Sequence, residues 1–245
     1  MKKYNIINFA RLKASPLFTL SKKNIYPTSD IFLWHKNLEV DYMLLNNNFI
    51  FKEKNDTYIK LFLLDRLGNI ISENNIEPKN GIFTVINVSK FLNGIKDSYG
   101  GFSIFQYLKN KKFGRAERGY VYYKNYLLKR SSLVHGNLDA VYLKDGKIYP
   151  CSSTTFISRK FFVQNVCKNT SLIKYYFANP TKKNQIVHIL DEKMKKIDKF
   201  LLNPLGGSIR GPYDSEMIIV KSRMPLCRPV IINDLKGINL DIYHA

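Results

Sequence analysis

The sequence predicts an all-β protein built of two tandem, related antiparallel β-sandwich modules, one at residues 17–150 and one at residues 151–245. Two observations carry this prediction. From Asp30 onward, short runs rich in Ile, Leu, Phe, Val and Tyr alternate with polar turns, a pattern typical of strands in a sandwich or barrel. The two halves also echo each other, which indicates a duplicated module.

The echo consists of four features that occur in the same order in each half. They are an aliphatic-Leu-Asp tripeptide, a proline thirteen residues later, a glycine three residues after the proline, and a closing run that ends in His and a small residue. The first half has Leu63-Leu64-Asp65, Pro78, Gly81 and Leu133-Val134-His135-Gly136, and the second has Ile189-Leu190-Asp191, Pro204, Gly207 and Ile242-Tyr243-His244-Ala245. The repeat predicts that His135 and His244 occupy equivalent strand ends.

The elements of the first module follow from β-rich runs between turn residues. Gly68 predicts a hairpin at residues 65–69 because glycine takes positive φ readily, and Asp145-Gly146 predicts a second hairpin. The expected strands are Leu17–Leu20, Ile31–Trp34, Tyr42–Leu45, Tyr58–Asp65, Ile70–Asn74, Gly81–Asn87, Phe102–Leu108, Gly119–Lys124, Leu133–Val134 and a hairpin within Asp139–Pro150, with a helical turn at Val88–Leu92.

The second module is expected to begin near Thr155. Met194, Ile197 and Phe200 recur at helical spacing, but the matching segment of the first half is a hairpin, so we expect a turn at Glu192–Lys195 and no long helix. The expected strands are Phe161–Val166, Leu172–Phe177, Gln185–Leu190, Phe200–Leu202, Glu216–Lys221 and Val230–Ile232.

The composition predicts large hydrophobic cores and a basic surface. Of 245 residues, 45% are hydrophobic and 13% aromatic, and 39 Lys and Arg against 19 acidic residues give a formal net charge of +20. Such a charge attracts phosphates, anionic glycans or acidic surfaces. Only nine of the 39 are Arg, the residue favoured for bidentate phosphate contacts, so a basic surface without a specific partner is the competing interpretation.

The cysteines and the absence of long apolar runs predict a cytoplasmic protein without a membrane span. Cys151, Cys167 and Cys227 are odd in number and have no short paired spacing, so neither a disulfide framework nor a zinc ribbon is indicated. Asn8 and Arg11 interrupt the apolar residues near the N-terminus before a signal sequence forms. No run approaches the 18 apolar residues of a membrane helix.

One segment of the second half resembles a known family. The run Glu216–Cys227 ends a strand in Ser-x-x-Pro, from Ser222 to Pro225, and the apolar Val230–Ile232 follows. This pattern resembles the sensory rhodopsin transducer family of small β-sandwich proteins, over roughly the 60 residues from Gln185 to Ala245. The resemblance implies a sandwich that binds a partner or small ligand without catalysis and tends to form homo-oligomers.

The histidines provide one candidate site. His35 closes an expected strand, so it is predicted to gather with His135 and His244 at loop ends, where neutral imidazoles hold zinc, iron or copper. Against this, no His-x-His spacing occurs and the nearby carboxylates are scattered. A histidine hydrogen-bonded at a strand end is the competing interpretation, and His188, inside an apolar strand, is read as structural.

The segment Lys109–Arg130 provides a second candidate site, because basic residues alternate with aromatic residues along it. Such a pattern suits the bases and phosphates of single-stranded nucleic acid, and aromatic faces also suit sugar rings. In a strand, Tyr120 and Tyr122 project from one face, and Val121 and Tyr123 from the other. No RNP, KH or helix-turn-helix pattern indicates specific nucleic-acid recognition.

Catalytic and cofactor signatures are incomplete. Ser132, His135 and Asp139 have the residue types of a nucleophilic triad, but residues so close on an extended chain do not converge and no Gly-x-Ser-x-Gly elbow exists. Gly100-Gly101 and Pro204–Gly207 lack the Gly-Lys-Ser ending of a phosphate loop and are predicted to be turns. We therefore expect no cofactor. The sequence favours a protein without catalytic activity over an enzyme.

The function predicted from the sequence is a non-catalytic intracellular binding or assembly protein with an anionic or carbohydrate-type ligand. The alternatives are a metal-dependent enzyme that uses the histidine cluster, and a nonspecific nucleic-acid binder. The candidate ligand-binding residues are Trp34, His35, Arg118, Tyr120, Tyr122, His135, Asn137 and His244.

Overall fold

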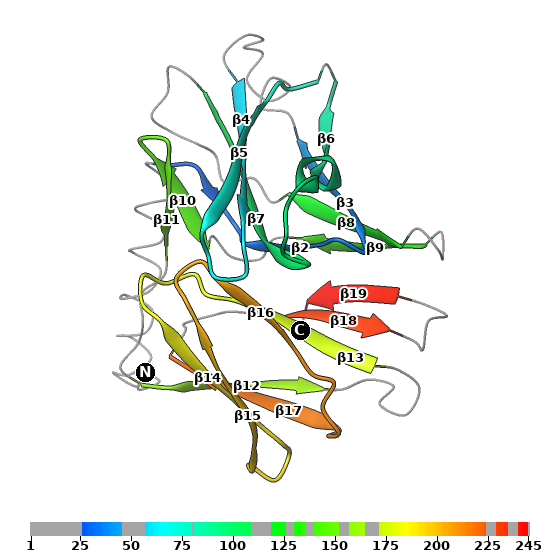
Figure 1. The fold of residues 1–245 in the computed structure, drawn as a ribbon, viewed down its shortest axis with the longest axis vertical. Coiled ribbons are helices and arrows are strands. Elements are labelled where there is room, and N and C mark those ends of the chain that lie inside the picture. The colour runs from blue at the N-terminus through cyan, green and yellow to red at the C-terminus, as the bar shows by residue number, and fades with distance from the viewer. Residues whose placement is uncertain are drawn as a thin grey trace, which may run out of the picture.

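The computed structural model describes residues 26–45, 57–79, 81–108, 119–125, 130–135, 140–151, 157–164, 172–223, 229–234 and 240–244. Within these ranges the chain forms strands, turns and one short 3-10 helix, and every paired strand is antiparallel (Figure 1). The predicted all-β class is confirmed. No helix in the described part of the chain is long and apolar enough to cross a membrane.

The first sandwich is made of two four-stranded sheets and the short helix η1 (Val88–Leu92), which falls where a helical turn was expected. One sheet has the order β2-β7-β4-β5 and the other β6-β3-β8-β9. Their bounds are β2 (Phe32–His35), β7 (Tyr99–Leu108), β4 (Thr57–Leu64), β5 (Ile70–Ile76), β6 (Phe83–Asn87), β3 (Glu39–Leu45), β8 (Tyr120–Asn125) and β9 (Arg130–His135).

The second sandwich has the same organisation. Its sheets have the orders β12-β17-β14-β15 and β16-β13-β18-β19. Their bounds are β12 (Arg159–Gln164), β17 (Met217–Ser222), β14 (Gln185–Leu190), β15 (Lys196–Leu202), β16 (Gly207–Arg210), β13 (Leu172–Ala178), β18 (Val230–Asp234) and β19 (Leu240–His244). Counted from the first strand of each sandwich, both have the orders 1-6-3-4 and 5-2-7-8.

The tripeptides of the sequence echo form equivalent hairpins. In β4–β5, Asp65 Oδ1 accepts hydrogen bonds from the backbone N–H groups of Leu67 and Asn69, both at 2.8 Å. In β14–β15, Asp191 Oδ1 accepts from Lys193 at 3.0 Å and Lys195 at 2.8 Å. Each hairpin also has a register shift at the two residues before its aspartate. The expected turn at residues 192–195 is confirmed.

The two hairpins differ in one residue for a physical reason. Gly68 and Met194 occupy the same turn position, with φ of +90° and +66°. A Cβ on Gly68 would lie 2.1 Å from the carbonyl oxygen of Pro204 in the other sandwich, whereas the Met194 side chain is exposed. Glycine is therefore required in the β4–β5 hairpin, which contacts the second sandwich, whereas the β14–β15 hairpin has room for a side chain at the same position.

A three-stranded sheet covers the outer face of β2-β7-β4-β5. It consists of β1 (Thr28–Ser29), β10 (Val141–Lys144) and β11 (Lys147–Pro150), with the predicted Asp145-Gly146 turn at positive φ. On the outer face of that sheet, Phe62 and Phe105 are fully buried, and Lys60 Nζ donates to the carbonyl of Gly146 at 3.4 Å. β11 ends at residue 150, and the next strand, β12, begins at residue 159.

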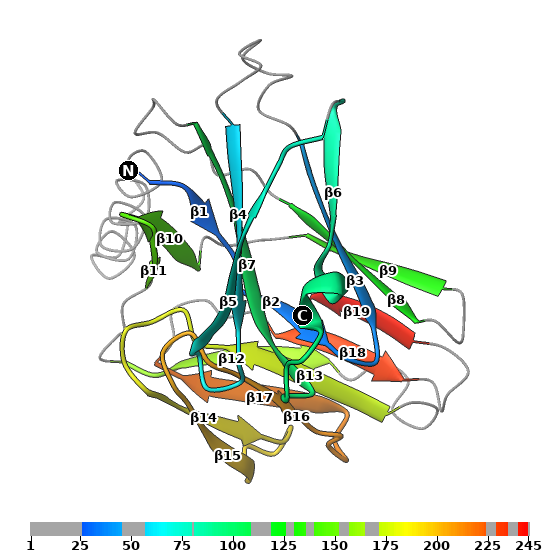
Figure 2. The same ribbon diagram turned by 45° about the horizontal axis from the view of Figure 1, so that its top comes forward.

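The two sandwiches share a buried contact. Sheet β16-β13-β18-β19 directs Tyr175 and Phe177 into its own core, whereas its other face contributes Tyr176, Ala178, Val230 and Ile242 to the core of the first sandwich. β19 runs beside β9, where Ile242 N–H donates to Ser132 Oγ at 3.0 Å (Figure 2). This sheet is therefore buried on both faces.

Two glycines make this contact close. A Cβ on Gly101 would lie 3.1 Å from the Tyr176 hydroxyl, and a Cβ on Gly207 would lie 2.5 Å from the Tyr176 ring. The prediction of a turn at Gly100-Gly101 is wrong, because both residues lie inside β7, where Gly100 admits the indole of Trp34. Pro204–Gly206 forms a turn, but Gly207 begins β16, a strand that was not expected.

The remaining strand predictions agree with the structure. Every expected strand within the described residues overlaps an observed one, although most observed strands begin or end a few residues away. The expected strand at residues 17–20 lies outside the described part of the chain.

Gly100→Ala tests whether this glycine is required. The new Cβ would lie 2.1 Å from the backbone oxygen of Leu64, which cannot move without shifting β4, so we expect the free energy of unfolding to fall by about 3 kcal/mol. Urea unfolding would measure it. The control Asn75→Ala, on the exposed edge strand β5, should change it little. Equal effects would contradict this account.

Asp65→Ala and Asp191→Ala test whether the two hairpins are equivalent. Each change removes an oxygen that accepts two backbone N–H groups, so each should lower the free energy of unfolding by about 1 kcal/mol. Thermal unfolding of both variants gives the comparison. A loss confined to one of them would mean that the hairpins do not have equivalent roles in stability.

Candidate ligand-binding face of the first sandwich

Trp34 belongs to the core and not to an exposed site. Its side chain is fully buried, and its indole Nε1–H donates to the carbonyl of Leu64 at 3.0 Å. The alternation along β2 explains this, because Phe32 and Trp34 both point between the two sheets of the first sandwich. The sequence placed Trp34 correctly at a strand end, but the ring is not available to a ligand.

His35 lies beside Trp34 on the opposite face of β2, toward the second sandwich. Its ring stacks on Tyr99, with 6.5 Å between centroids, and its Nδ1 accepts the N–H of Asn37 at 3.1 Å. Burial, and then the positive charge of Lys174 on β13, hold the pKa of His35 below its usual value. His35 is thus a neutral imidazole hydrogen-bonded at a strand end, as the competing interpretation of the histidines predicted.

Two of the predicted residues, Tyr120 and Tyr122, share the outer face of sheet β6-β3-β8-β9. Tyr120 lies directly opposite His135 on β9, and Tyr122 lies opposite Leu133. Val121 and Tyr123 point the other way and are buried in the core, which confirms the predicted alternation. The Tyr123 side chain extends across that core, and its hydroxyl donates to the Leu33 carbonyl at 2.9 Å. Burial raises the pKa of Tyr123.

This outer face carries aromatic or apolar side chains on each of its four strands. One row of cross-strand partners runs Val85, Met43, Tyr120, His135, and the next runs Asn87, Asp41, Tyr122, Leu133. Tyr120 is 39% exposed and Leu133 49% exposed. We call the residues Met43, Phe83, Val85, Tyr120, Tyr122 and Leu133 the aromatic face.

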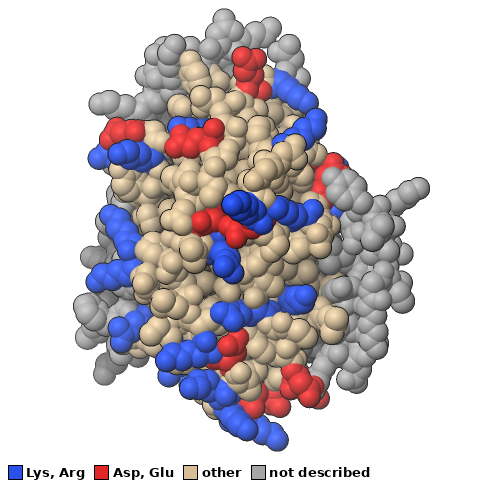
Figure 3. All heavy atoms as spheres, in the orientation of Figure 1, with Lys and Arg blue, Asp and Glu red and all other residues tan. Residues whose placement is uncertain are grey.

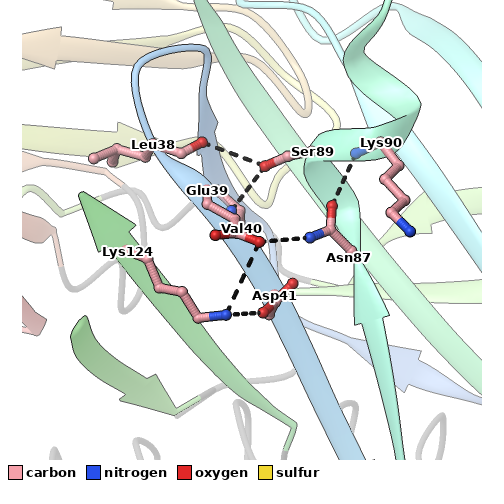
Figure 4. A network of polar contacts seen from close by, with 8 residues as sticks. All are labelled: Leu38, Glu39, Val40, Asp41, Asn87, Ser89, Lys90 and Lys124. Atoms are coloured by element: carbon pink, nitrogen blue, oxygen red, sulfur yellow. Dashed lines mark hydrogen bonds and ion pairs between the residues drawn. The ribbon is translucent and has the colours of Figure 1, made fainter. Parts of the chain in front are cut away.

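A polar network borders the aromatic face (Figure 4). Lys124 Nζ on β8 lies 2.5 Å from Asp41 Oδ2 and 4.0 Å from Glu39 Oε1, both on β3. Asn87 Nδ2 on β6 donates to the same Glu39 oxygen at 2.9 Å. The network holds two carboxylates and one ammonium group, so its net charge is negative.

The helix η1 fixes the position of this network. Asn87 is the N-cap, and its Oδ1 accepts the N–H of Lys90 at 3.0 Å while its amide group faces Glu39. Ser89 Oγ accepts the N–H of Val40 at 2.8 Å and donates to the Leu38 carbonyl at 3.3 Å. The polar groups at this border are therefore held by the backbone as well as by one another.

The sequence analysis missed Glu39, Asp41 and Asn87, and it included Lys124 only as a basic residue of the segment Lys109–Arg130. The alternation of Glu39-Val40-Asp41-Tyr42 does predict that the two carboxylates share one face of a strand. It carries no information about Lys124 and Asn87, because the pairing of β3 with β8 and β6 brings them there from 83 and 48 residues away.

Trp34 and His35, on β2, do not belong to this face. His244 ends β19, at the position that His135 occupies in β9, as the echo predicted. The side chains of His135 and His244, and all of Arg118 and Asn137, lie outside the described part of the chain. Among the described residues, no three His, Cys, Asp or Glu side chains form a group that could hold a metal.

Comparisons with known proteins add no relative. No family model, no curated protein and no solved structure matches the chain. The resemblance of residues 185–245 to the sensory rhodopsin transducer family stays a prediction.

The lowered pKa of His35 predicts a dependence of stability on pH. The unfolded chain, with the usual histidine pKa near 6.5, binds a proton that the folded protein resists, so the free energy of unfolding should fall as the pH drops below this value. His35→Gln should flatten that decrease, as measured by urea unfolding across the range. The pKa of His188 is also lowered, so His188→Gln serves as the comparison. An unchanged slope in His35→Gln would contradict the assignment.

Proposed function

We propose that this protein is a non-catalytic binding protein whose aromatic face recognises a carbohydrate-type ligand. The proposal develops the ligand class that the sequence suggested, and it rests on the observations that follow. We also propose that the two sandwiches arose by duplication of one module, an idea supported by their common strand order and by the matched aspartate hairpins.

A comparison of equivalent positions in the two sandwiches carries the proposal. Tyr120, Tyr122 and Leu133 of the first sandwich correspond in register to Val230, Ile232 and Ile242 of the second. The second set packs on the first sandwich, whereas the first set remains exposed or half-buried. A face that is an interface in one sandwich is therefore open in the other, and tyrosine replaces aliphatic side chains there.

The chemistry of the aromatic face favours a sugar over an anion. Tyrosine rings present flat apolar surfaces that pack on the C–H faces of a sugar ring, and their hydroxyl groups form hydrogen bonds. Asp41, Glu39 and Asn87 add acceptors and a donor suited to sugar hydroxyls. In the described part of this border the two carboxylates outnumber Lys124, which favours a neutral ligand over an anionic one.

The alternatives have less support at this face. Nonspecific binding of nucleic acid requires a positively charged groove beside the aromatic rings, and the described border of the aromatic face is net negative. Metal-dependent catalysis would need ligands beyond the two histidines that end β9 and β19. A cytoplasmic location is supported by the cysteine pattern, and association into homo-oligomers stays a prediction.

Binding of neutral soluble polysaccharides, such as β-glucan, mannan and xylan, tests the proposal. Tyr122→Ala and Tyr120→Ala should each weaken the binding that the full-length protein shows by about tenfold, because each removes an aromatic platform. Binding should persist when salt is raised, since no ion pair to the ligand is involved. Isothermal titration calorimetry and affinity electrophoresis measure both effects.

The matched control is Phe162→Ala, which removes an exposed aromatic ring from the second sandwich. It should leave polysaccharide binding unchanged. The proposal fails if the tyrosine variants bind as the unaltered protein does, or if binding disappears as salt rises.

A further inference from the structure

The outer face of sheet β12-β17-β14-β15 forms a second surface of distinct chemistry. A row of cross-strand partners on this face runs Lys160, Lys221, His188, Lys199, one residue from each strand. Exposed apolar side chains flank the row, with Phe162 65%, Leu201 55% and Ile186 49% exposed. We call these seven residues the basic sheet face.

No acidic side chain neutralises this row from its own sheet. Asp198 is the only acidic residue in the four strands, and it lies on the inner face, where its Oδ2 accepts a hydrogen bond from the Tyr213 hydroxyl at 2.6 Å. In the described part of the chain, Lys160, Lys199 and Lys221 form no ion pair. Figure 3 shows several lysine and arginine side chains at this end of the molecule, with a few acidic side chains among them.

The positive charges of the row contribute to the lowered pKa of His188. The groups that face it are Lys221 on β17 and Lys199 and Lys196 on β15. Burial first, and then the charges of these three lysines, lower the pKa of His188. The imidazole is therefore neutral at neutral pH, and it gains a charge only in more acidic solution or beside a surface that supplies negative charge.

The equivalent face of the first sandwich is covered. Phe62 in β4 is the equivalent of His188 in β14, because each lies one residue before the two residues at which its strand shifts register. The Phe62 side chain is fully buried beneath β10–β11. In the second sandwich the same position is part of a basic row, and the same face carries exposed Phe162, Ile186 and Leu201 beside the buried Ile219. The position that forms an internal contact in the first sandwich therefore belongs, in the second, to a surface that attracts negative charge.

The side chains around the row favour a lipid surface over nucleic acid. Lysines neutralise either kind of phosphate. Stacking on bases requires several aromatic rings, and the basic sheet face has only the Phe162 phenyl ring and the His188 imidazole. Ile186 and Leu201 have no role with nucleic acid, but together with Phe162 they suit insertion at the boundary between headgroups and acyl chains. A flat sheet face with cations between apolar side chains matches that boundary.

We propose that the basic sheet face docks the protein on an anionic lipid surface, with Lys160, Lys199 and Lys221 beside the headgroups and Phe162, Ile186 and Leu201 inserted among them. This surface belongs to the second sandwich and is separate from the aromatic face. Docking would leave Tyr120 and Tyr122 free, so the two activities can be lost independently.

Vesicle sedimentation with the full chain tests the proposal. Phosphatidylcholine vesicles that contain phosphatidylglycerol should bind the protein, and pure phosphatidylcholine vesicles should bind it much more weakly. Lys199→Gln combined with Lys221→Gln should reduce binding to the anionic vesicles about 25-fold, because each lysine near such a surface contributes about a fivefold factor. The matched control combines Lys90→Gln with Lys147→Gln, two exposed lysines outside the second sandwich, and has the same net charge.

A second pair of variants separates lipid from other polyanions. Phe162→Ser and Leu201→Ser should weaken vesicle binding but leave binding to heparin and to a single-stranded oligonucleotide unchanged. The proposal is overturned if the control pair weakens vesicle binding as much as the test pair, because net charge alone would then explain it. It is also overturned if the oligonucleotide is bound and the anionic vesicles are not. Polysaccharide binding by the same variants shows whether the aromatic face is intact.

Discussion

Tyr176 lies where the two sandwiches meet, between Gly101 of the first and Gly207 of the second. This contact determines which outer face of the second sandwich is buried. The Tyr176 ring approaches Gly207 of its own sandwich and its hydroxyl approaches Gly101 of the other, so closely that a Cβ at Gly207 would overlap the ring. The contact extends the core of the first sandwich with Ala178, Val230 and Ile242. Close packing of this kind holds two sandwiches together over a continuous buried surface.

This contact decides which faces stay open. Each sandwich has two outer faces, and the same topology would give both sandwiches the same surfaces. In the first, the outer face of β2-β7-β4-β5 is covered by β10–β11. In the second, the outer face of β16-β13-β18-β19 is buried at the contact. Among the described residues, each sandwich therefore keeps one outer face with exposed side chains, and these two faces are not equivalent.

The two exposed faces differ in chemistry. The aromatic face has tyrosines and a negative polar border, whereas the basic sheet face has lysines between aliphatic side chains. Residues at a buried contact must match their partner in shape, but residues on an open face are free of that constraint. Position in the assembly, rather than the fold of each sandwich, thus explains why equivalent positions carry Tyr122 in one copy and Ile232 in the other.

The fold class, most strands and the hairpins could be predicted from the sequence, because these follow from local patterns: the period of two, the positive φ at Gly68 and Gly146, and the repeated Asp65 and Asp191. The sites could not, because they depend on long-range packing. The tertiary structure buried Trp34, placed Gly100 inside a strand, and brought Lys124 and Asn87 to Glu39, because strand pairing joins residues far apart in sequence. Which faces remain open depends on packing between sandwiches, and no local pattern encodes that.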